Sequence, residues 1–258
     1  VPFAEFYRRK RNVVRMGQEI NWDTRAVQSF IAMEDSSFRS HPGLDLPGIV
    51  RAALVNLRAG RVKEGASTIT QQVARLRFLS RERNIIRKVR EASLALLLEL
   101  KLSKAEIIEL YLNEVPMGHG ALGAEAAARF YFEKSLKDLS WGESAIVASL
   151  TTRPGELSPL VNRDGSREKV QVVFRKLVER GILTPDQAEK EYDALEKNFY
   201  TTLNRSPNDS AFHQRLNLHP YAGEYVKSVL PFRFLRRLYS GGLRIYTSIN
   251  VEHQKAAE

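Results

Sequence analysis

Helix-start signals recur along this chain, and they constrain its fold more than any other feature. In a capping box, a serine or threonine and a glutamate or glutamine three residues later each bond the backbone N–H of the other residue. Thr68, Ser103, Ser140 and Thr184 each open a segment with this pattern. They predict separate helices joined by loops, and therefore a mainly α fold.

Apolar spacing extends the helical prediction to other parts of the chain. Residues 85–102 carry apolar side chains at helical intervals and predict one long helix. Asp23 is a candidate N-cap for a helix that runs to about Asp35. A further helix is expected over 47–59, with a proline near its first turn and Gly60 after its end.

The sequence changes character beyond residue 204. Residues 205–210 are typical of a linker, and residues 241–249 alternate apolar and polar side chains as a β-strand does. A single strand at a chain end needs a partner. We therefore expect one domain over 1–204, followed over 205–258 by a linker and the start of a second domain that this chain does not complete.

The composition narrows the possible chemistry. The absence of cysteine excludes disulfides, thiolate nucleophiles and cysteine-bound metals. The net charge is +10, and residues 75–104 are especially rich in lysine and arginine. Such a surface attracts nucleic acid, anionic lipid or a phosphorylated substrate. No stretch approaches the roughly 18 apolar residues that cross a bilayer.

Glu34 is the most informative single residue. It follows Val27, Phe30 and Ile31 at helical intervals and therefore falls on the apolar face of its predicted helix. A carboxylate placed there loses contact with water, which suits it to proton transfer near neutral pH. The alternative is that the helix ends near residue 33 and that Glu34 is a solvated residue at its end.

Glu91 is the second candidate. It lies three and four residues after Lys88 and Arg87, so the three side chains share one helix face. The order of cation before glutamate is the weaker one for helix stability, which favours a site. An ordinary surface cluster of ion pairs is the more common explanation of such a triplet.

The loop over 65–72 gathers hydroxyl and amide side chains before a helix. Thr68 and Gln71 have the spacing of a capping box, which is a purely structural role. Alternatively, the hydroxyls, the amides and the exposed backbone N–H groups bind the oxygens of a sugar or a pyrophosphate. The loop by itself does not decide between these interpretations.

Four segments, taken in order and spacing, resemble the glycosyltransferase domain of class A penicillin-binding proteins, glycosyltransferase family 51. They are Glu34 to Asp45, Gly65 to Gln72, Arg87 to Glu91 and Glu106 to Val115. The resemblance covers roughly residues 24–200. It implies a lysozyme-like fold, mainly α, with two lobes and a cleft, in which a partly apolar segment near 40–64 dips toward the membrane. The tail resembles the strand that leads into a transpeptidase domain.

The resemblance implies a peptidoglycan glycosyltransferase that polymerises lipid II into β-1,4 glycan strands. The 4-hydroxyl of one unit attacks the anomeric carbon of the lipid-linked glycan, the configuration inverts and undecaprenyl pyrophosphate leaves. Glu34 would be the general base. Arg75, Arg87 and Lys88 would balance the charge of the diphosphate. Glu91, the second catalytic residue, would orient these cations or stabilise charge in the donor site.

The resemblance also implies a set of residues that contact the substrate. Besides Arg75, Arg87 and Lys88, this set comprises Asp35, Phe38, His41, Ser67, Thr68, Gln71, Gln72, Asn113, Glu114 and Arg153. The resemblance does not establish a requirement for any cofactor. A divalent cation, Mg or Mn, could assist at the diphosphate, but the sequence contains no spacing typical of metal ligands.

Some positions depart from the family pattern. Arg75 and Leu76 stand where the family usually has lysine and asparagine, and Thr152 stands where it commonly has a lysine that binds substrate. Pro116 and Met117 replace an aromatic pair. Arginine keeps the charge with a different geometry, whereas Leu76 offers no hydrogen bond. These departures bear on the donor site and on activity, not on the fold.

The expected partners are lipid II, the lipid-linked glycan strand and the membrane surface, with a transpeptidase domain following in the full-length protein. The expected location is the cytoplasmic membrane, facing the periplasm or the cell exterior. A lysozyme-like hydrolase is one alternative, although it would not need the cations of 75–91. A catalytically impaired cell-wall scaffold is another. Nucleic acid is not expected as a partner, because the basic clusters lack interleaved aromatic residues.

Overall fold

The computed structural model describes residues 13–61, 65–79, 84–119, 121–201 and 203. These residues belong to one compact unit. The predicted linker, the predicted strand and the start of a second domain all lie outside the described residues. The boundary between 204 and 205 therefore stays a prediction.

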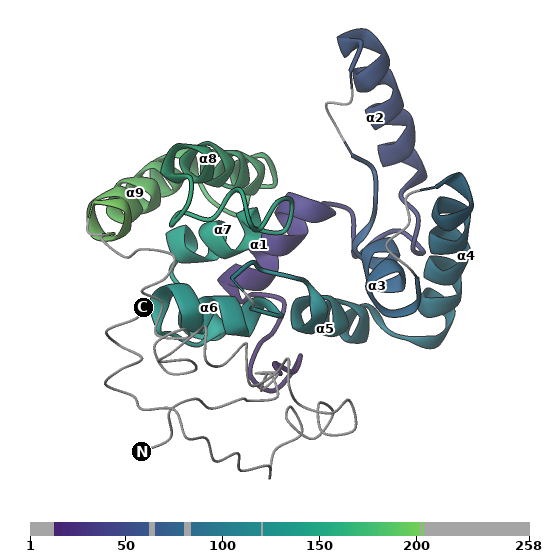
Figure 1. Ribbon diagram of the computed structural model, residues 1–258, viewed down its shortest axis with the longest axis horizontal. Coiled ribbons are helices and arrows are strands. Elements are labelled where there is room, and N and C mark those ends of the chain that lie inside the picture. The colour runs from purple at the N-terminus through teal and green to yellow at the C-terminus, as the bar shows by residue number, and fades with distance from the viewer. Residues whose placement is uncertain (1–12, 62–64, 80–83, 120, 202, 204–258) are drawn as a thin grey trace, which may run out of the picture. The chain divides into compact units, whose positions relative to one another are not determined.

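Regular structure in the described residues is helical, which confirms the mainly α class (Figure 1). The α-helices are α1 (Arg25–Glu34), α2 (Leu46–Ala59), α3 (Ile69–Phe78), α4 (Ile85–Lys101), α5 (Lys104–Glu114), α6 (Ala124–Phe132), α7 (Trp141–Ser149), α8 (Arg163–Glu179) and α9 (Pro185–Leu195). A short 3-10 turn over Leu136–Asp138 precedes α7, and a π-helical turn over Glu196–Tyr200 follows α9.

All four predicted capping boxes are present. Thr68, Ser103, Ser140 and Thr184 are the N-caps of α3, α5, α7 and α9, and each side chain accepts a hydrogen bond from the backbone N–H three residues later. In each case the glutamate or glutamine at that position bonds back to the N-cap backbone. These local bonds satisfy N–H groups that a helix cannot pair internally.

The predicted start of the first helix was wrong by one residue. The N-cap of α1 is Thr24 rather than Asp23, and it makes no capping bond with its side chain. Instead, the Thr24 hydroxyl accepts a hydrogen bond from the backbone N–H of Asn21 at 2.9 Å. The helix ends at Glu34, with Asp35 as its C-cap.

Helix α1 lies at the centre of the packing. It contacts both α7 and α8, and α7 is almost completely buried. One apolar core includes side chains from α1, α3, α5 and α6, and a second lies mainly among α7, α8 and α9. Figure 1 shows α1 between these two groups of helices. Its C-terminal end is therefore held from two sides.

Helix α2 is attached differently, because it projects away from the other helices (Figure 1) and buries only Gly48 and Ala52. Its N-cap is Asp45, which accepts hydrogen bonds from the Gly48 backbone N–H at 2.9 Å and the Ser37 hydroxyl at 2.7 Å. The bond from Gly48 and, to a smaller extent, the bond from Ser37 hold the pKa of Asp45 below its ordinary value of 3.8. The helix ends at Gly60 in the left-handed conformation, as predicted.

Among the described residues, no helix combines the length and the apolar character that crossing a bilayer requires.

Candidate active site

Glu34 is the last residue of α1, and its half-buried carboxylate is held by two neutral side chains. The Gln72 amide donates to Oε2 at 2.7 Å, and the Thr151 hydroxyl donates to Oε1. The residue is therefore neither a freely solvated helix end nor a carboxylate enclosed by apolar groups. Neutral donors fix the direction of a carboxylate without pairing its charge, so it can still accept a proton.

The C-terminal end of α1 is an unfavourable place for acidic side chains, because the helix dipole puts partial negative charge there. Two cations lie at this end, one from α8 and one from its C-cap. The Lys176 ammonium donates to the Met33 carbonyl at 2.6 Å, and the Arg180 guanidinium donates to the Ser36 carbonyl. Lys176 satisfies a carbonyl of the last turn of α1, Arg180 satisfies one in the loop just beyond it, and both offset the charge near Glu34.

Asp35 is buried and joins three segments. Its Oδ2 accepts a hydrogen bond from the Ile69 backbone N–H at 2.8 Å, and both of its oxygens lie 3.0 Å from Nε2 of His41. The Gly43 backbone N–H donates to Nδ1 of the same ring at 3.1 Å. Nδ1 is thus an acceptor and Nε2 carries the proton. The end of α1, the following loop and the start of α3 are fixed together.

The loop over 36–45 is also anchored from α4 and α5. Lys104 donates to the His41 carbonyl at 2.6 Å, pairs with Glu99 at 2.7 Å and lies 4.5 Å from the centre of the Phe38 ring. Phe38 is fully buried in the first core. Gly43 has φ of 96°, and a Cβ there would come within 3.0 Å of the Ala95 carbonyl oxygen. The loop therefore packs too closely on α4 for any other residue.

The capping residues of α3 are engaged within the protein. Thr68 and Gln71 are buried, and the Thr68 hydroxyl donates to the Gly43 carbonyl at 2.7 Å while it accepts from the Gln71 N–H. Both side chains thus have structural hydrogen bonds, as the capping interpretation of the loop predicted. Their contact with substrate stays a prediction, as it does for the buried Asp35, Phe38 and His41.

Glu91 is buried beside two cations. Its Oε1 pairs with Arg87, its Oε2 lies 3.1 Å from the Lys88 ammonium, and its side chain is 2% exposed. Lys88 is 49% exposed and also donates to the Ser67 hydroxyl at 2.7 Å. The carboxylate therefore holds the cations, and Lys88 presents its charge to solvent.

The segment over 67–72 connects the two glutamates. Ser67 at one end bonds Lys88, which pairs with Glu91, and Gln72 at the other end bonds Glu34. Both carboxylates are thus connected by hydrogen bonds to the start of α3. That Glu34 and Glu91 line the same cleft stays a prediction.

Arg75 lies one helical turn beyond Gln72, so the two side chains share a face of α3. It is exposed, and within the described ranges it has no hydrogen bond or ion pair. Burial and the charge of Glu34 raise the pKa of the Tyr111 hydroxyl, whereas the charge of Arg75 lowers it. The exposed Arg75 cation therefore shares a face of α3 with Gln72, the residue that bonds Glu34.

Three other predicted residues make contacts elsewhere. Asn113 bonds the backbone N–H and carbonyl of Val14, each at 2.9 Å. Glu114 pairs with Arg77 at 3.1 Å, and the exposed Arg153 pairs with Glu156 at 3.3 Å. None of these contacts leads to Glu34 or Glu91, and a role in substrate binding stays a prediction for each.

Thr151 and Tyr111 were missed by the reasoning from sequence. Thr151 follows Leu150, the C-cap of α7, and its hydroxyl reaches Glu34 across 117 positions of sequence. The Tyr111 hydroxyl is completely buried, and burial first, then the negative charge of Glu34, raises its pKa well above 10.0. Helical spacing marked Tyr111 only as part of an apolar face, and no local signal marked Thr151.

A metal could be held by three or more nearby carboxylate or histidine side chains, and the described residues contain no such group. The acidic residues of the site are already occupied, because Glu91 pairs with two cations and Asp35 accepts from His41 and a backbone N–H.

Comparisons with known proteins agree with one another. Residues 2–178 match the family described as Transglycosylase. Penicillin-binding protein 1A of Aquifex aeolicus is 38% identical over 232 residues, 90% of this chain and 30% of that protein. The protein of the same name from Escherichia coli is 39% identical over 233 residues, 90% of this chain and 26% of that protein.

The crystal structure of penicillin-binding protein 1A from Haemophilus influenzae is 26% identical, with a TM-score of 0.37, over 66% of this chain and 19% of that chain. The chain thus spans 30% or less of the length of the relatives that it matches.

Asp35→Asn tests the structural role of the buried carboxylate. The amide turns an NH₂ group toward the N–H donors of Ile69 and His41, so at least one donor loses its partner. We expect the free energy of unfolding in urea to fall by about 2–4 kcal/mol. The exposed Asp138→Asn is the control and should change it by less than about 0.5 kcal/mol. Equal stability of the two variants would contradict this role.

Proposed function

The chain belongs to the transglycosylase family, and we propose that it is a peptidoglycan glycosyltransferase that polymerises lipid II. One observation carries the proposal. Among the described residues, a carboxylate that pairs with no cation and a cluster of cations are attached to opposite ends of one short segment, 67–72. The reaction needs both, since a hydroxyl must lose a proton while a diphosphate leaves.

Glu34 is the general base of the proposed reaction. Its two partners are neutral, and among the described residues no cation pairs with it. The carboxylate accepts the proton of the attacking 4-hydroxyl as the new glycosidic bond forms at the anomeric carbon. Inversion follows because the hydroxyl attacks from the side opposite the leaving diphosphate.

The leaving group is undecaprenyl pyrophosphate, whose negative charge grows as its bond to the sugar breaks. Lys88 and Arg87, held by Glu91, and the exposed Arg75 supply positive charge for it. A divalent cation that assists the reaction would be bound mainly by the diphosphate oxygens, because the nearby carboxylates have other partners.

A lysozyme-like hydrolase would use one glutamate in a similar way. It would cut finished glycan, whose leaving group is a neutral sugar hydroxyl, and would have no need for a buried carboxylate that holds two cations. The cations at Glu91 therefore favour the transferase. A catalytically impaired scaffold would retain the fold and lose turnover.

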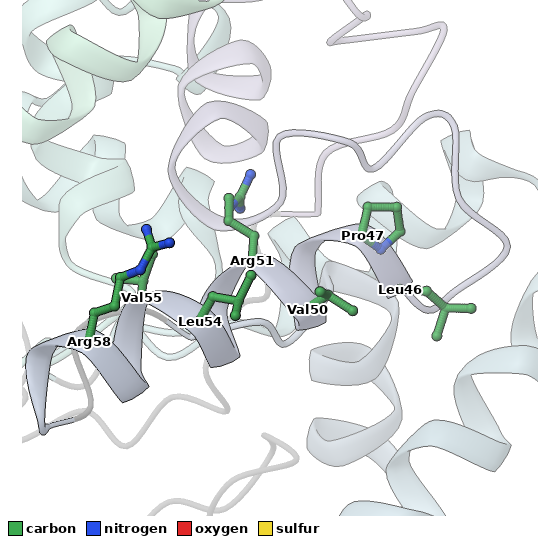
Figure 2. A pocket seen from close by; sticks show the side chains of 7 residues that line it. All are labelled: Leu46, Pro47, Val50, Arg51, Leu54, Val55 and Arg58. Atoms are coloured by element: carbon green, nitrogen blue, oxygen red, sulfur yellow. The ribbon is translucent and has the colours of Figure 1, made fainter.

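The membrane surface is the second part of the proposal. Helix α2 exposes a stripe of apolar side chains, among them Leu46, Val50, Leu54 and Leu57, of which Leu57 is 81% exposed. Figure 2 shows Arg51 and Arg58 on the same helix as Val50 and Leu54. Apolar residues flanked by arginine suit a helix that lies in the headgroup region of an anionic bilayer. Such contact would bring the site to its lipid-linked substrate.

The proposed location follows from this contact, namely the outer side of the cytoplasmic membrane, facing the periplasm or the cell exterior. We also propose that a transpeptidase domain follows in the full-length protein, because this chain spans only 30% or less of its relatives named penicillin-binding protein 1A.

Glu34→Gln tests the base. The amide is nearly the same shape but does not accept the proton, so the rate of lipid II polymerisation should fall by about 10²–10⁴-fold. Thermal unfolding should change little, because an amide can still bond Gln72 and Thr151. Near wild-type polymerisation by the variant would remove Glu34 from this role. Fragments released from finished peptidoglycan by the wild type would instead support a hydrolase.

Arg75→Ala tests the donor site. A charge-assisted bond to phosphate contributes about 1.5–3 kcal/mol, so the variant should bind a lipid-linked pyrophosphate about 10–100-fold more weakly. Arg75→Lys should restore much of this affinity, because it restores the charge. The control is Arg175→Ala, which removes an exposed arginine from α8. Titration of the lipid-linked pyrophosphate against the wild type and the three variants measures these affinities. Equal affinities of the wild type and Arg75→Ala would mean that Arg75 is an ordinary solvated residue.

A double substitution of Leu54→Glu and Leu57→Glu tests the membrane contact. Burying a leucine side chain contributes about 1.5–3 kcal/mol, so loss of two should weaken binding to anionic lipid vesicles by at least about 10-fold. Val161 is 56% exposed on another part of the surface, and Val161→Glu is the matched control. Sedimentation with vesicles measures the difference. Equal binding by the double variant and the wild type would exclude α2 as the contact.

A further inference from the structure

The hydroxyl of Thr151 is shared between two acceptors. It lies within hydrogen-bond distance of Oε1 of Glu34, and it is 3.0 Å from the Ala148 carbonyl oxygen near the end of α7. A threonine hydroxyl has a single proton, so it can donate fully to only one of them at a time. The direction of this proton determines whether Glu34 has one firm donor or two.

A second hydroxyl lies beside the first. Tyr111 is completely buried on α5, and Thr151 is the hydroxyl that interacts with it. Within the described part of the chain, the Tyr111 hydroxyl has no partner at the distance and angle of a normal hydrogen bond. Burial and the charge of Glu34 raise its pKa far above neutrality, so it keeps its proton at every pH at which the protein functions.

An unpaired buried hydroxyl is unfavourable for folding, and phenylalanine would fill the same space without that penalty. The ring of Tyr111 already packs edge-to-face on Phe30, with centroids 6.0 Å apart, and this contact does not need the hydroxyl. The position of the hydroxyl, next to Thr151 and near Glu34, therefore points to a role at the site.

We propose that Thr151 is the positioning residue of the general base, and that the Tyr111 hydroxyl directs the Thr151 proton toward Glu34. When Tyr111 donates to Oγ1 of Thr151, the threonine hydroxyl becomes a stronger donor, and its proton goes to the charged Glu34 carboxylate, a stronger acceptor than the neutral Ala148 carbonyl. Gln72 then holds one carboxylate oxygen and Thr151 holds the other, which fixes the plane of the carboxylate. The inference rests on the proposed function of Glu34 as the base.

Substitutions at both positions test the arrangement in the full chain, with turnover of lipid II as the first measurement. Thr151→Val keeps the shape and removes the hydroxyl, so kcat should fall on the order of 10–100-fold while KM changes little. Thr151→Ser restores the hydroxyl and should recover kcat to within about 3-fold of wild type. Tyr111→Phe should lower kcat by about 3–10-fold without lowering the temperature of unfolding.

Tyr200→Phe is a matched control in the second core. Its hydroxyl is also buried but lies 2.7 Å from the Ser166 hydroxyl, far along the sequence from Glu34. This variant loses a bond that is already made, so it should lose stability and keep kcat, the opposite of Tyr111→Phe. A purely structural role for Thr151 or Tyr111 would give the pattern of Tyr200→Phe, and that result would overturn the proposal.

A second measurement does not depend on turnover. The carboxyl carbon resonance of Glu34 is identified by ¹³C NMR as the glutamate signal that Glu34→Gln removes. Thr151→Val and Tyr111→Phe should move this resonance, Thr151→Ser should return it, and Tyr200→Phe should leave it in place. If the wild type does not polymerise lipid II, the proposed function fails, and the resonance still decides the positioning. An unmoved resonance in both test variants would overturn the inference.

Discussion

Two consecutive carboxylates at the negative end of a helix are the constraint on which the rest of the site depends. Glu34 and Asp35 both stand where the dipole of α1 disfavours them. Lys176 and Arg180 bond the backbone carbonyls of Met33 and Ser36 and offset the negative charge there. Among the described residues, no cation pairs with the Glu34 carboxylate, which is held by Gln72 and Thr151.

The two candidate catalytic glutamates have the same chemistry and opposite surroundings. Glu34 is half-buried between a neutral amide and a neutral hydroxyl, whereas Glu91 is buried between Arg87 and Lys88. A carboxylate that pairs with two cations is a poor proton acceptor and a good support for positive charge. In the proposed reaction, these environments assign the general base to Glu34 and the support of positive charge to Glu91.

Local sequence signals predicted the parts of the fold that local bonds determine. The four capping boxes, the end of α2 at Gly60 and the shared face of Glu91 with its cations all involve residues a few positions apart. Thr151 reaches Glu34 across 117 positions and Lys176 reaches Met33 across 143. Only tertiary packing creates such contacts, so periodicity could not reveal them. The same limit explains why the buried bonds of Asp35 were not foreseen.

The attachment of α2 differs from that of the loop before it. The helix buries only two small residues, so its local stability depends on its caps and on whatever covers its apolar stripe. The preceding loop is held by buried bonds from His41, Thr68 and Lys104. An adjustment of α2 to a lipid surface therefore need not disturb the end of α1, because the bonds of the loop lie between the two. The proposed contact with lipid and the proposed general base can therefore occupy adjacent segments of the chain.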